Sequence, residues 1–196
     1  MKDTRTLTLT TPSDREIVMT RIVDAPRRLA FEAWTKPEHP PHWMLGPPSW
    51  TMPVCEIDLR PGGEWHFVWR RSDGTEMGMR GVHQEITPPE RLVATESWGG
   101  NWPETLKTLM LSEEDGKTTV TIRVLYPSKE ARDAALQTGM KDGMSQGFDR
   151  LDEYLASLGA RGTEKAVNGS WNPFQPHCLT RSRRRGSRRP SPAAAG

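Results

Sequence analysis

The sequence predicts an α+β fold in which one curved antiparallel sheet of six to seven strands wraps around a long C-terminal helix. Three observations lead to this prediction. Apolar residues alternate with period two between residues 50 and 126, they recur three, four and seven apart over residues 128–158, and two short helical segments follow the first strand. Because only one long helix can cover the apolar face of the sheet, we expect it to lie in the concavity.

The first strand is expected at residues 16–23, where EIVMTRIV is rich in β-branched residues. A helix then opens at Pro26, because the fixed φ of proline suits the first helical position. A second helix starts in the same way at residues 35–37, but Pro40 and Pro41 would remove its hydrogen bonds, so we expect it to be short or broken. The buried side of the first helix is marked by Leu29, Ala30, Ala33 and Trp34.

Six more strands and one helix complete the domain. Asp73-Gly74 and Asp115-Gly116 are strong hairpin signals, so the sheet is expected to be a meander. The strands are expected at about 50–60, 64–71, 76–86, 91–98, 104–113 and 117–126. Residues 128–158 are expected to form a single helix whose apolar side carries Met140, Met144, Phe148, Leu151, Leu155 and Leu158.

The 196 residues suffice for one domain with appendages. We expect a flexible N-terminus over residues 1–14, the domain over 15–159 and a disordered basic tail over 160–196. The tail carries eight Lys or Arg and one acidic residue, whereas the rest of the chain carries 19 basic and 24 acidic residues. Two interpretations of the tail stay open: an arm that contacts nucleic acid weakly and without specificity, or an unselected extension of the kind that GC-rich codons encode outside their frame.

Three stretches of the sequence resemble a known family. They are DAPRRLAFEAWTKPEH (24–39), LRPGGEWHFVWRRSDGTEMGMRGVHQEITPPERLV (59–93) and YPSKEARDAALQTGMKDGMSQGFDRLDEYL (126–155). Together they resemble the SRPBCC or START-like superfamily, and more narrowly the family named for the C-terminal domain of the activator of the heat-shock protein 90 ATPase. The resemblance covers about residues 15–158 and implies the helix-grip fold. Two features depart from it, since Pro40-Pro41 interrupts the short helix and residues 160–196 have no counterpart in the family.

Ring-rich and Met-rich strands suggest where a ligand could bind. Trp65, Phe67 and Trp69 share one strand face, Met77 and Met79 lie on the next strand, and such a face is either the wall of an apolar ligand cavity or ordinary core. Which face of each strand points inward stays open.

Three glycines at four-residue intervals, Gly139, Gly143 and Gly147, form a stripe on the long helix. Each costs the helix about 1 kcal/mol relative to Ala, so the stripe indicates a spatial need. Either it vacates volume for a ligand beside Met144 and Phe148, or it allows the helix backbone to approach the sheet; a helix break at Gly139 is a third interpretation.

Ionisable residues on or near the strands are candidates for an acid, a base or a polar anchor in such a cavity: His66, His83, Glu56, Asp58, Glu85 and Glu96. Glu96 is preferred because it shares a strand face with Ala94 and Trp98; the alternative is an exposed carboxylate or an ion pair with Arg80 or Arg91. The candidate ligand-cavity residues are therefore Trp65, Phe67, Trp69, Met77, Met79, Glu96, Trp98, Gly143, Met144, Gly147 and Phe148.

Motifs for metal, nucleotide or covalent chemistry are missing from the sequence. His39 and His42 are separated by two prolines, Cys55 has no evident His partner, and neither a G-x-S-x-G elbow nor a phosphate-binding loop occurs. We therefore expect no metal or other cofactor and no catalytic residues. No apolar run reaches the length of a membrane span and no secretory leader is evident, so the expected location is the cytoplasm.

Three functions remain open on this basis. The first is a START-like domain that binds a hydrophobic small molecule between the long helix and the sheet. The second is a protein-interaction module that regulates a chaperone or another protein, as the name of the resembled family suggests. The third is a cyclase-like or hydrolase-like enzyme, which no motif supports.

Overall fold

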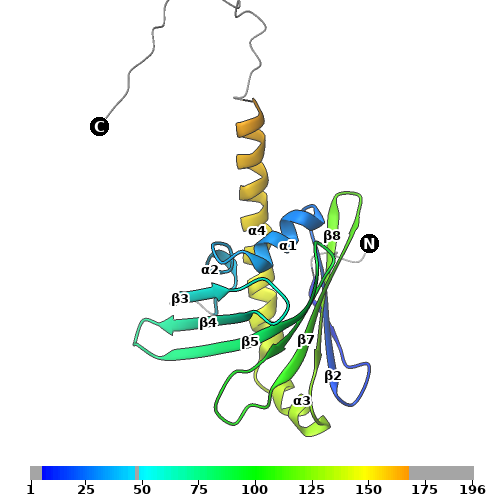
Figure 1. Cartoon of the computed structure of the whole chain (residues 1–196), viewed down its shortest axis with the longest axis vertical. Helices are drawn as coiled ribbons and strands as arrows, with labels where there is room; N and C mark the ends of the chain where they lie inside the picture. Colours follow the sequence, from blue (N-terminus) through cyan, green and yellow to red (C-terminus); the bar gives the residue numbers. More distant parts are fainter. Residues whose placement is uncertain (1–5, 47–48, 168–196) are drawn as a thin grey trace, which may run out of the picture.

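The computed structural model describes residues 6–46 and 49–167, which form one antiparallel sheet and four helices (Figure 1). The helices are α1 Arg27–Thr35, α2 Pro40–Trp43, α3 Lys129–Leu136 and α4 Met140–Val167. None of them is both long and apolar enough to cross a membrane. The strands are β1 Thr8–Thr10, β2 Glu16–Val23, β3 Trp50–Ile57, β4 Glu64–Arg71, β5 Glu76–Thr87, β6 Arg91–Glu96, β7 Thr105–Glu114 and β8 Lys117–Leu125.

The sheet has eight strands in the order β1-β2-β8-β7-β6-β5-β4-β3, and every neighbouring pair is antiparallel. The predicted α+β class and curved sheet are therefore confirmed. The long strand β5 pairs with β4 through its first half and with β6 through its second half, and the register shifts between His83 and Glu85. Such irregularities bend a sheet. As a result β3 and β4 run across α4, whereas β2, β7 and β8 run alongside it (Figure 1).

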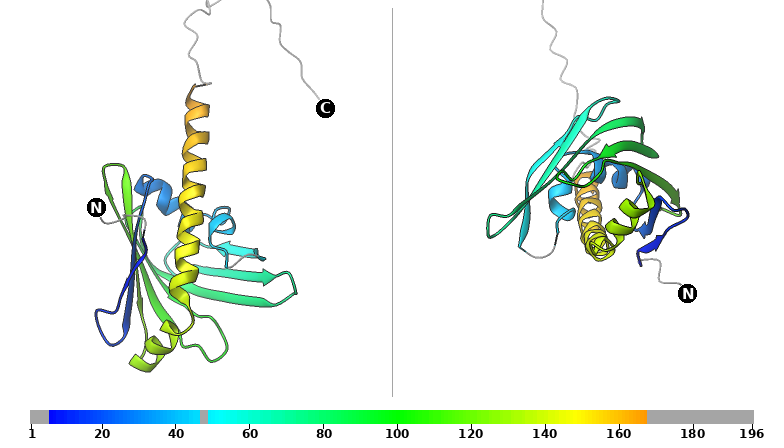
Figure 2. Two further views of the ribbon diagram at one scale, coloured as in Figure 1. Left: turned by 180° about the vertical axis from the view of Figure 1, so that it is seen from behind. Right: turned by 90° about the horizontal axis from the view of Figure 1, so that it is seen from below.

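Helix α4 lies in the concavity of the sheet, as the end-on view in Figure 2 shows. Phe148, Leu151 and Leu155 are buried on its inner side and join the core cluster of β2, β7 and β8. β2 also binds α4 through an ion-pair cluster. The buried guanidinium of Arg21 on β2 lies 2.7 Å from carboxylate oxygens of Asp149 and Asp152 on α4. Apolar packing and this ion-pair cluster thus fix how α4 docks.

Both ends of the domain differ from the sequence prediction. Residues 1–14 are predicted to be flexible, but Thr8–Thr10 forms the edge strand β1, because Leu9 within the strand and Leu7 just before it pack against the core. The tail is predicted to begin at residue 160, but α4 continues to Val167. The rest of the predicted tail, residues 168–196, lies outside the described residues.

The helices follow the prediction except in where they begin and end. One helix is expected over residues 128–158, but α3 and α4 are separated at Gly139, whose φ of +75° belongs to the left-handed region that favours glycine. The second helix is expected to be short or broken, and α2 is indeed short, with four residues. It begins at Pro40 rather than before it, because prolines at the first positions of a helix give up only N–H groups that have no intrahelical acceptor.

Candidate functional site

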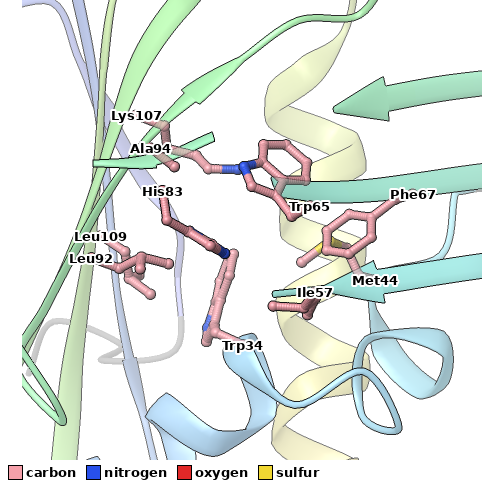
Figure 3. A pocket seen from close by; sticks show the side chains of 10 residues that line it. All are labelled: Trp34, Met44, Ile57, Trp65, Phe67, His83, Leu92, Ala94, Lys107 and Leu109. Carbon is pink, nitrogen blue, oxygen red and sulfur yellow. The ribbon is translucent and has the colours of Figure 1, made fainter. Parts of the chain in front are cut away.

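A pocket opens on the concave face of the sheet, between α1, the turn after α2 and the strands around the bend (Figure 3). Its free volume is about 30 Å³, which is enough to hold water. Pockets that enclose a drug-sized ligand begin at roughly 300 Å³. The ligand-sized space that the sequence suggests is therefore not preformed. The lining residues are Trp34, Met44, Ile57, Trp65, Phe67, His83, Leu92, Ala94, Lys107 and Leu109.

The floor of the pocket is a row of residues that pair across three strands. His83 on β5 pairs with Ala94 on β6, and Ala94 pairs with Lys107 on β7. Residues opposite each other in antiparallel strands point to the same face. The small side chain of Ala94 therefore leaves free space between an imidazole and an ammonium group.

The main chain of His83 is held where β5 leaves β4. Its N–H donates to the carbonyl of Gly63 at 2.9 Å, and its carbonyl accepts from the N–H of Gly62 at 2.7 Å. The register shift of β5 follows directly after it. Bulges of this kind often aim a side chain at a functional site, and here His83 points into the pocket beneath Trp65 (Figure 3).

Aromatic rings form the walls. Trp65 and Phe67 come from β4 with ring centroids 5.1 Å apart, and Trp34 faces them from α1 (Figure 3). The ring of Trp34 is itself braced by Trp43, at a centroid distance of 4.6 Å. The pocket thus offers flat apolar surfaces from two sides.

Several buried nitrogen atoms at the pocket have no hydrogen-bond partner among the described residues. They are Nδ1 and Nε2 of His83, Nε1 of Trp34 and Nε1 of Trp65. His83 is only 4% exposed. Burial lowers the pKa of His83, and the positive charge of Lys107 lowers it further, so the imidazole is neutral at pH 7. A neutral imidazole with one donor and one acceptor nitrogen thus faces the void.

Lys107 is engaged by Glu96. Its Nζ lies 2.6 Å from Oε2 of Glu96 and 4.7 Å from the centroid of the Trp65 ring. The other oxygen of Glu96 accepts from Nε1 of Trp98 at 3.0 Å. Glu96 is buried and salt-bridged, but its partner is neither Arg80 nor Arg91 as the sequence suggested, and Arg91 pairs with Glu85 instead.

The residues predicted on the strands are only partly brought together. Trp65 and Phe67 line the pocket. Trp69 and Met79 are buried beside them in a second apolar cluster, whereas Met77 and Trp98 are 39% exposed at its edge. Glu96 reaches the pocket only through Lys107.

The residues predicted on α4 do not line the pocket. Gly143 faces open space on the exposed side of the helix, and a Cβ at Gly147 would lie 3.9 Å from the carbonyl oxygen of Trp43. Met144 and Phe148 pack into the main core, where Phe148 lies beside Trp34 at a ring distance of 6.3 Å. The three glycines of the stripe therefore have three different roles. Gly139 separates two helices, Gly143 lies on an open surface, and Gly147 lies where the α4 backbone approaches the backbone of α2.

Of the lining residues, the sequence predicted Trp65 and Phe67 and offered His83 as an ionisable candidate; it missed the others, among them Trp34 and Lys107. Lys107 carried a signal, because it alternates in phase with Leu109 and Leu111 on β7 and so belongs to the inner face. Trp34 carried none beyond its place on the buried side of α1, since the pocket joins segments that are far apart in the chain.

The cysteine and histidine candidates for covalent or metal chemistry are held in protein contacts. Burial raises the pKa of the Cys55 thiol to about 12, which keeps it protonated and unreactive at neutral pH. Nδ1 of His39 lies 2.8 Å from the hydroxyl of Tyr154, and the ring of His42 stacks on the same Tyr154. Across the described part of the chain, no three His, Cys, Asp or Glu side chains are grouped so that they could hold a metal ion.

Comparison with known proteins identifies relatives of this domain. The family model described as Activator of Hsp90 ATPase homolog 1-like protein matches residues 24–156. No curated protein matches the chain. A crystal structure of a protein from Rhodobacter sphaeroides is 30% identical, with a TM-score of 0.73, and the match covers 78% of this chain and 99% of that one.

More distant solved structures share the fold. A protein from Nitrosomonas europaea is 23% identical, with a TM-score of 0.68 and coverage of 76% of this chain and 99% of the other. The AHSA1-like protein from Aeromonas hydrophila is 17% identical, with a TM-score of 0.60 and coverage of 71% and 93%. The strand order, the helix in the concavity and the match of the family model over residues 24–156 agree, and the chain belongs to the Activator of Hsp90 ATPase homolog 1-like family of START-like, helix-grip domains.

Proposed function

We propose that this protein is a small-molecule-binding START-like domain whose ligand, mainly apolar, binds in the pocket on the concave face with His83 as its polar anchor. One observation supports this proposal most strongly. Buried polar groups in proteins are nearly always hydrogen-bonded, and exceptions need an explanation such as a missing ligand or water. Among the residues that line this void, His83, Trp34 and Trp65 each carry such a buried nitrogen atom, with no partner in the part of the chain that the structure describes.

The ligand must enlarge the void, because about 30 Å³ does not hold a molecule of several carbon atoms. Met44 is the wall residue best suited to yield, since it is partly buried at the edge of both apolar clusters. Methionine side chains are flexible and repack at low cost. We therefore expect binding by rearrangement of the side chains around Met44.

The test is to fill the floor of the pocket. Ala94→Leu places a larger side chain between His83 and Lys107, and we expect it to weaken binding of the uncharged fluorescent probe N-phenyl-1-naphthylamine at least tenfold. The matched control is Gly143→Leu, which adds a leucine on the exposed side of α4 and should leave binding unchanged. Circular dichroism of both variants checks that they fold, and native mass spectrometry of the parent protein looks for a co-purified molecule.

Equal probe affinity of the parent and the folded Ala94→Leu variant would contradict the proposal. A parent protein that binds no apolar probe and carries no co-purified molecule would contradict it as well. Either result would leave the second candidate function in the lead.

That second candidate is a protein-interaction module, and an exposed apolar edge favours it. Met77 and Trp98 are each 39% exposed and Trp102 is 43% exposed. Trp98 also stacks on the buried ring of Trp69 at 5.7 Å, which holds it in place. Exposed aromatic side chains in fixed positions are typical anchors of protein interfaces. The family name suggests a chaperone of the heat-shock protein 90 type as the partner.

This alternative predicts an effect of Trp98→Ser on chaperone binding. We would measure the ATPase rate and the affinity of a bacterial heat-shock protein 90 with the parent domain, with Trp98→Ser and with the control Leu59→Ser. Leu59 is 38% exposed in the turn between β3 and β4 and matches Trp98 in exposure. Loss of stimulation with Trp98→Ser alone would favour the interaction module, and the absence of any stimulation by the parent would exclude this partner.

A further inference from the structure

We propose that the polar group of the ligand is a hydroxyl, so that the pocket selects an uncharged alcohol or phenol over its hydrocarbon and carboxylate counterparts. This inference rests on the function proposed above and specifies its ligand class. The hydroxyl is placed beside His83, over Ala94, with the carbon skeleton directed towards Met44, Ile57 and Phe67.

The size of the void sets the first condition. Its volume of about 30 Å³ exceeds the roughly 10–15 Å³ that one water molecule needs but is far too small for a ligand, so the ligand-free pocket has room beside His83 for water only. A ligand atom that takes this place must be no larger than the water that it replaces. A hydroxyl group meets this condition, whereas an amide or a carboxylate brings additional atoms.

The hydrogen-bonding pattern sets the second condition. A neutral imidazole has one N–H donor and one acceptor nitrogen, and the indole nitrogens of Trp34 and Trp65 are donors only. All these atoms are buried and lack a partner within the described residues. A carbonyl oxygen would satisfy the donors but leave the acceptor nitrogen of His83 unpaired. A hydroxyl accepts from a donor and donates to the imidazole, and so avoids the cost of leaving a buried group unpaired.

The charge balance sets the third condition. The groups that act on His83 are the ammonium of Lys107 on β7 and, from the β3–β4 turn, the carboxylate of Asp58. Lys107 is already paired with Glu96 at 2.6 Å, and Asp58 is paired with Arg60 at 2.8 Å. Lys107 is the only cation of the two and is already neutralised by Glu96, while Asp58 is itself an anion, so neither group can compensate an anionic ligand. Burial of an uncompensated carboxylate is strongly unfavourable. The pocket therefore favours an uncharged molecule.

The experiment compares three probes that share one ring and differ in the polar group: phenol, benzene and benzoate. Their affinities for the full chain are measured by titration in two-dimensional NMR spectra, with the indole N–H signals of Trp34 and Trp65 as reporters. We expect phenol to bind at least tenfold more tightly than benzene or benzoate, the factor that one or two hydrogen bonds provide. Only phenol should shift both indole signals strongly.

Two variants of His83 test the role of the imidazole. His83→Phe removes both nitrogen atoms and keeps a flat ring, so it should bind phenol and benzene equally. His83→Gln keeps one donor and one acceptor and should retain part of the preference for phenol. Thermal unfolding shows whether each variant is folded, and His83→Gln serves as the test if His83→Phe is not.

The outcomes separate this inference from the function on which it rests. If benzene or benzoate binds the parent as tightly as phenol, the hydroxyl preference is wrong while the pocket remains a binding site. An unchanged preference for phenol in folded His83→Phe or His83→Gln also overturns the inference. If none of the three probes binds while N-phenyl-1-naphthylamine does, the hydroxyl preference is wrong and the pocket remains a binding site. If no apolar probe binds either, both the inference and the proposed function fail.

Discussion

Gly81 on β5 leaves no room for a side chain, although it lies in the middle of a strand. A Cβ atom at this position would overlap the backbone carbonyl of Thr95 and lie 2.8 Å from Nε1 of Trp65. The glycine therefore allows two strands to approach closely at the bend and allows the Trp65 ring to lie across its cross-strand partner.

We predict that Gly81→Ala destabilises the protein by about 2 kcal/mol or more, because backbone atoms on the neighbouring strand must move. Gly78→Ala is the matched control on the same strand, since its Cβ would meet only the carbonyl of Phe67 at 3.9 Å. Urea unfolding of both variants measures the difference. Equal stabilities would show that the bend accommodates a methyl group.

His83 also couples the pocket to pH. Its pKa is lowered in the folded state, chiefly by burial, so below the ordinary pKa of about 6.5 the unfolded chain binds a proton that the folded chain does not. The free energy of unfolding therefore falls as pH decreases from about 6.5 towards the lowered pKa. The contribution of one histidine is at most about 1.4 kcal/mol per pH unit.

We predict that His83→Gln loses stability less steeply than the parent between pH 6.5 and pH 5. Burial also lowers the pKa of His39, so His39→Gln provides the comparison for a histidine outside the pocket. Urea unfolding at several pH values gives the slopes. A His83→Gln slope equal to that of the parent would mean that His83 is protonated equally in the folded and unfolded states.

At the scale of elements, the segment after β8 consists of two helices because one glycine has a left-handed conformation. Gly139 has a φ of +75°, and α3 and α4 meet there. Gly143, four residues later, lies inside α4, and nothing would contact a Cβ placed on it. Two glycines of the same stripe therefore differ in backbone conformation: Gly139 is left-handed and separates two helices, whereas Gly143 is part of a helix.

We predict effects of opposite sign for alanine at these two positions. Gly139→Ala should destabilise the protein by about 1–2 kcal/mol, the cost of a left-handed conformation for a residue with a Cβ. Gly143→Ala should stabilise it by up to about 1 kcal/mol, because alanine has the higher helix propensity. Differential scanning calorimetry shows the two shifts in Tm. A stabilising Gly139→Ala would indicate that α3 and α4 can join into one helix.

At the scale of the whole molecule, the bend of the sheet creates the pocket. The strands β3 and β4 run across α4 and the strands β7 and β8 run alongside it, so α1 and the turn after α2 close the corner between them (Figures 1 and 2). Beyond the sheet, α4 projects to Val167. The family model ends at residue 156, before this projection.

We predict that a chain truncated after Val167 unfolds at the same temperature as the full chain. Residues 168–196 are rich in Arg, Ser, Pro and Ala and lack the periodic apolar residues that a packed core needs. Thermal unfolding of the two chains, followed by circular dichroism, tests this. A decrease of many degrees on truncation would show that the segment packs on the domain.

The sequence by itself determined most of the elements, because their signals are local. The alternation of EWHFVWRR predicted β4, Asp115-Gly116 predicted a hairpin in which both residues indeed have positive φ, and the spacing of Phe148, Leu151 and Leu155 predicted the buried side of α4. An apolar period of two or of about four residues involves only residues that are close together in the chain. It can therefore be read without knowing how distant segments pack.

Only the tertiary structure decided the site. The pairing of Lys107 with Glu96, the position of Trp34 opposite Trp65 and the void over Ala94 each depend on residues from different elements. The glycine stripe on α4 pointed to the wrong place, because spacing along a helix does not state which neighbour fills the space beside it. Volume and unpaired hydrogen-bonding groups arise from packing between distant segments, so no local pattern in the sequence encodes them.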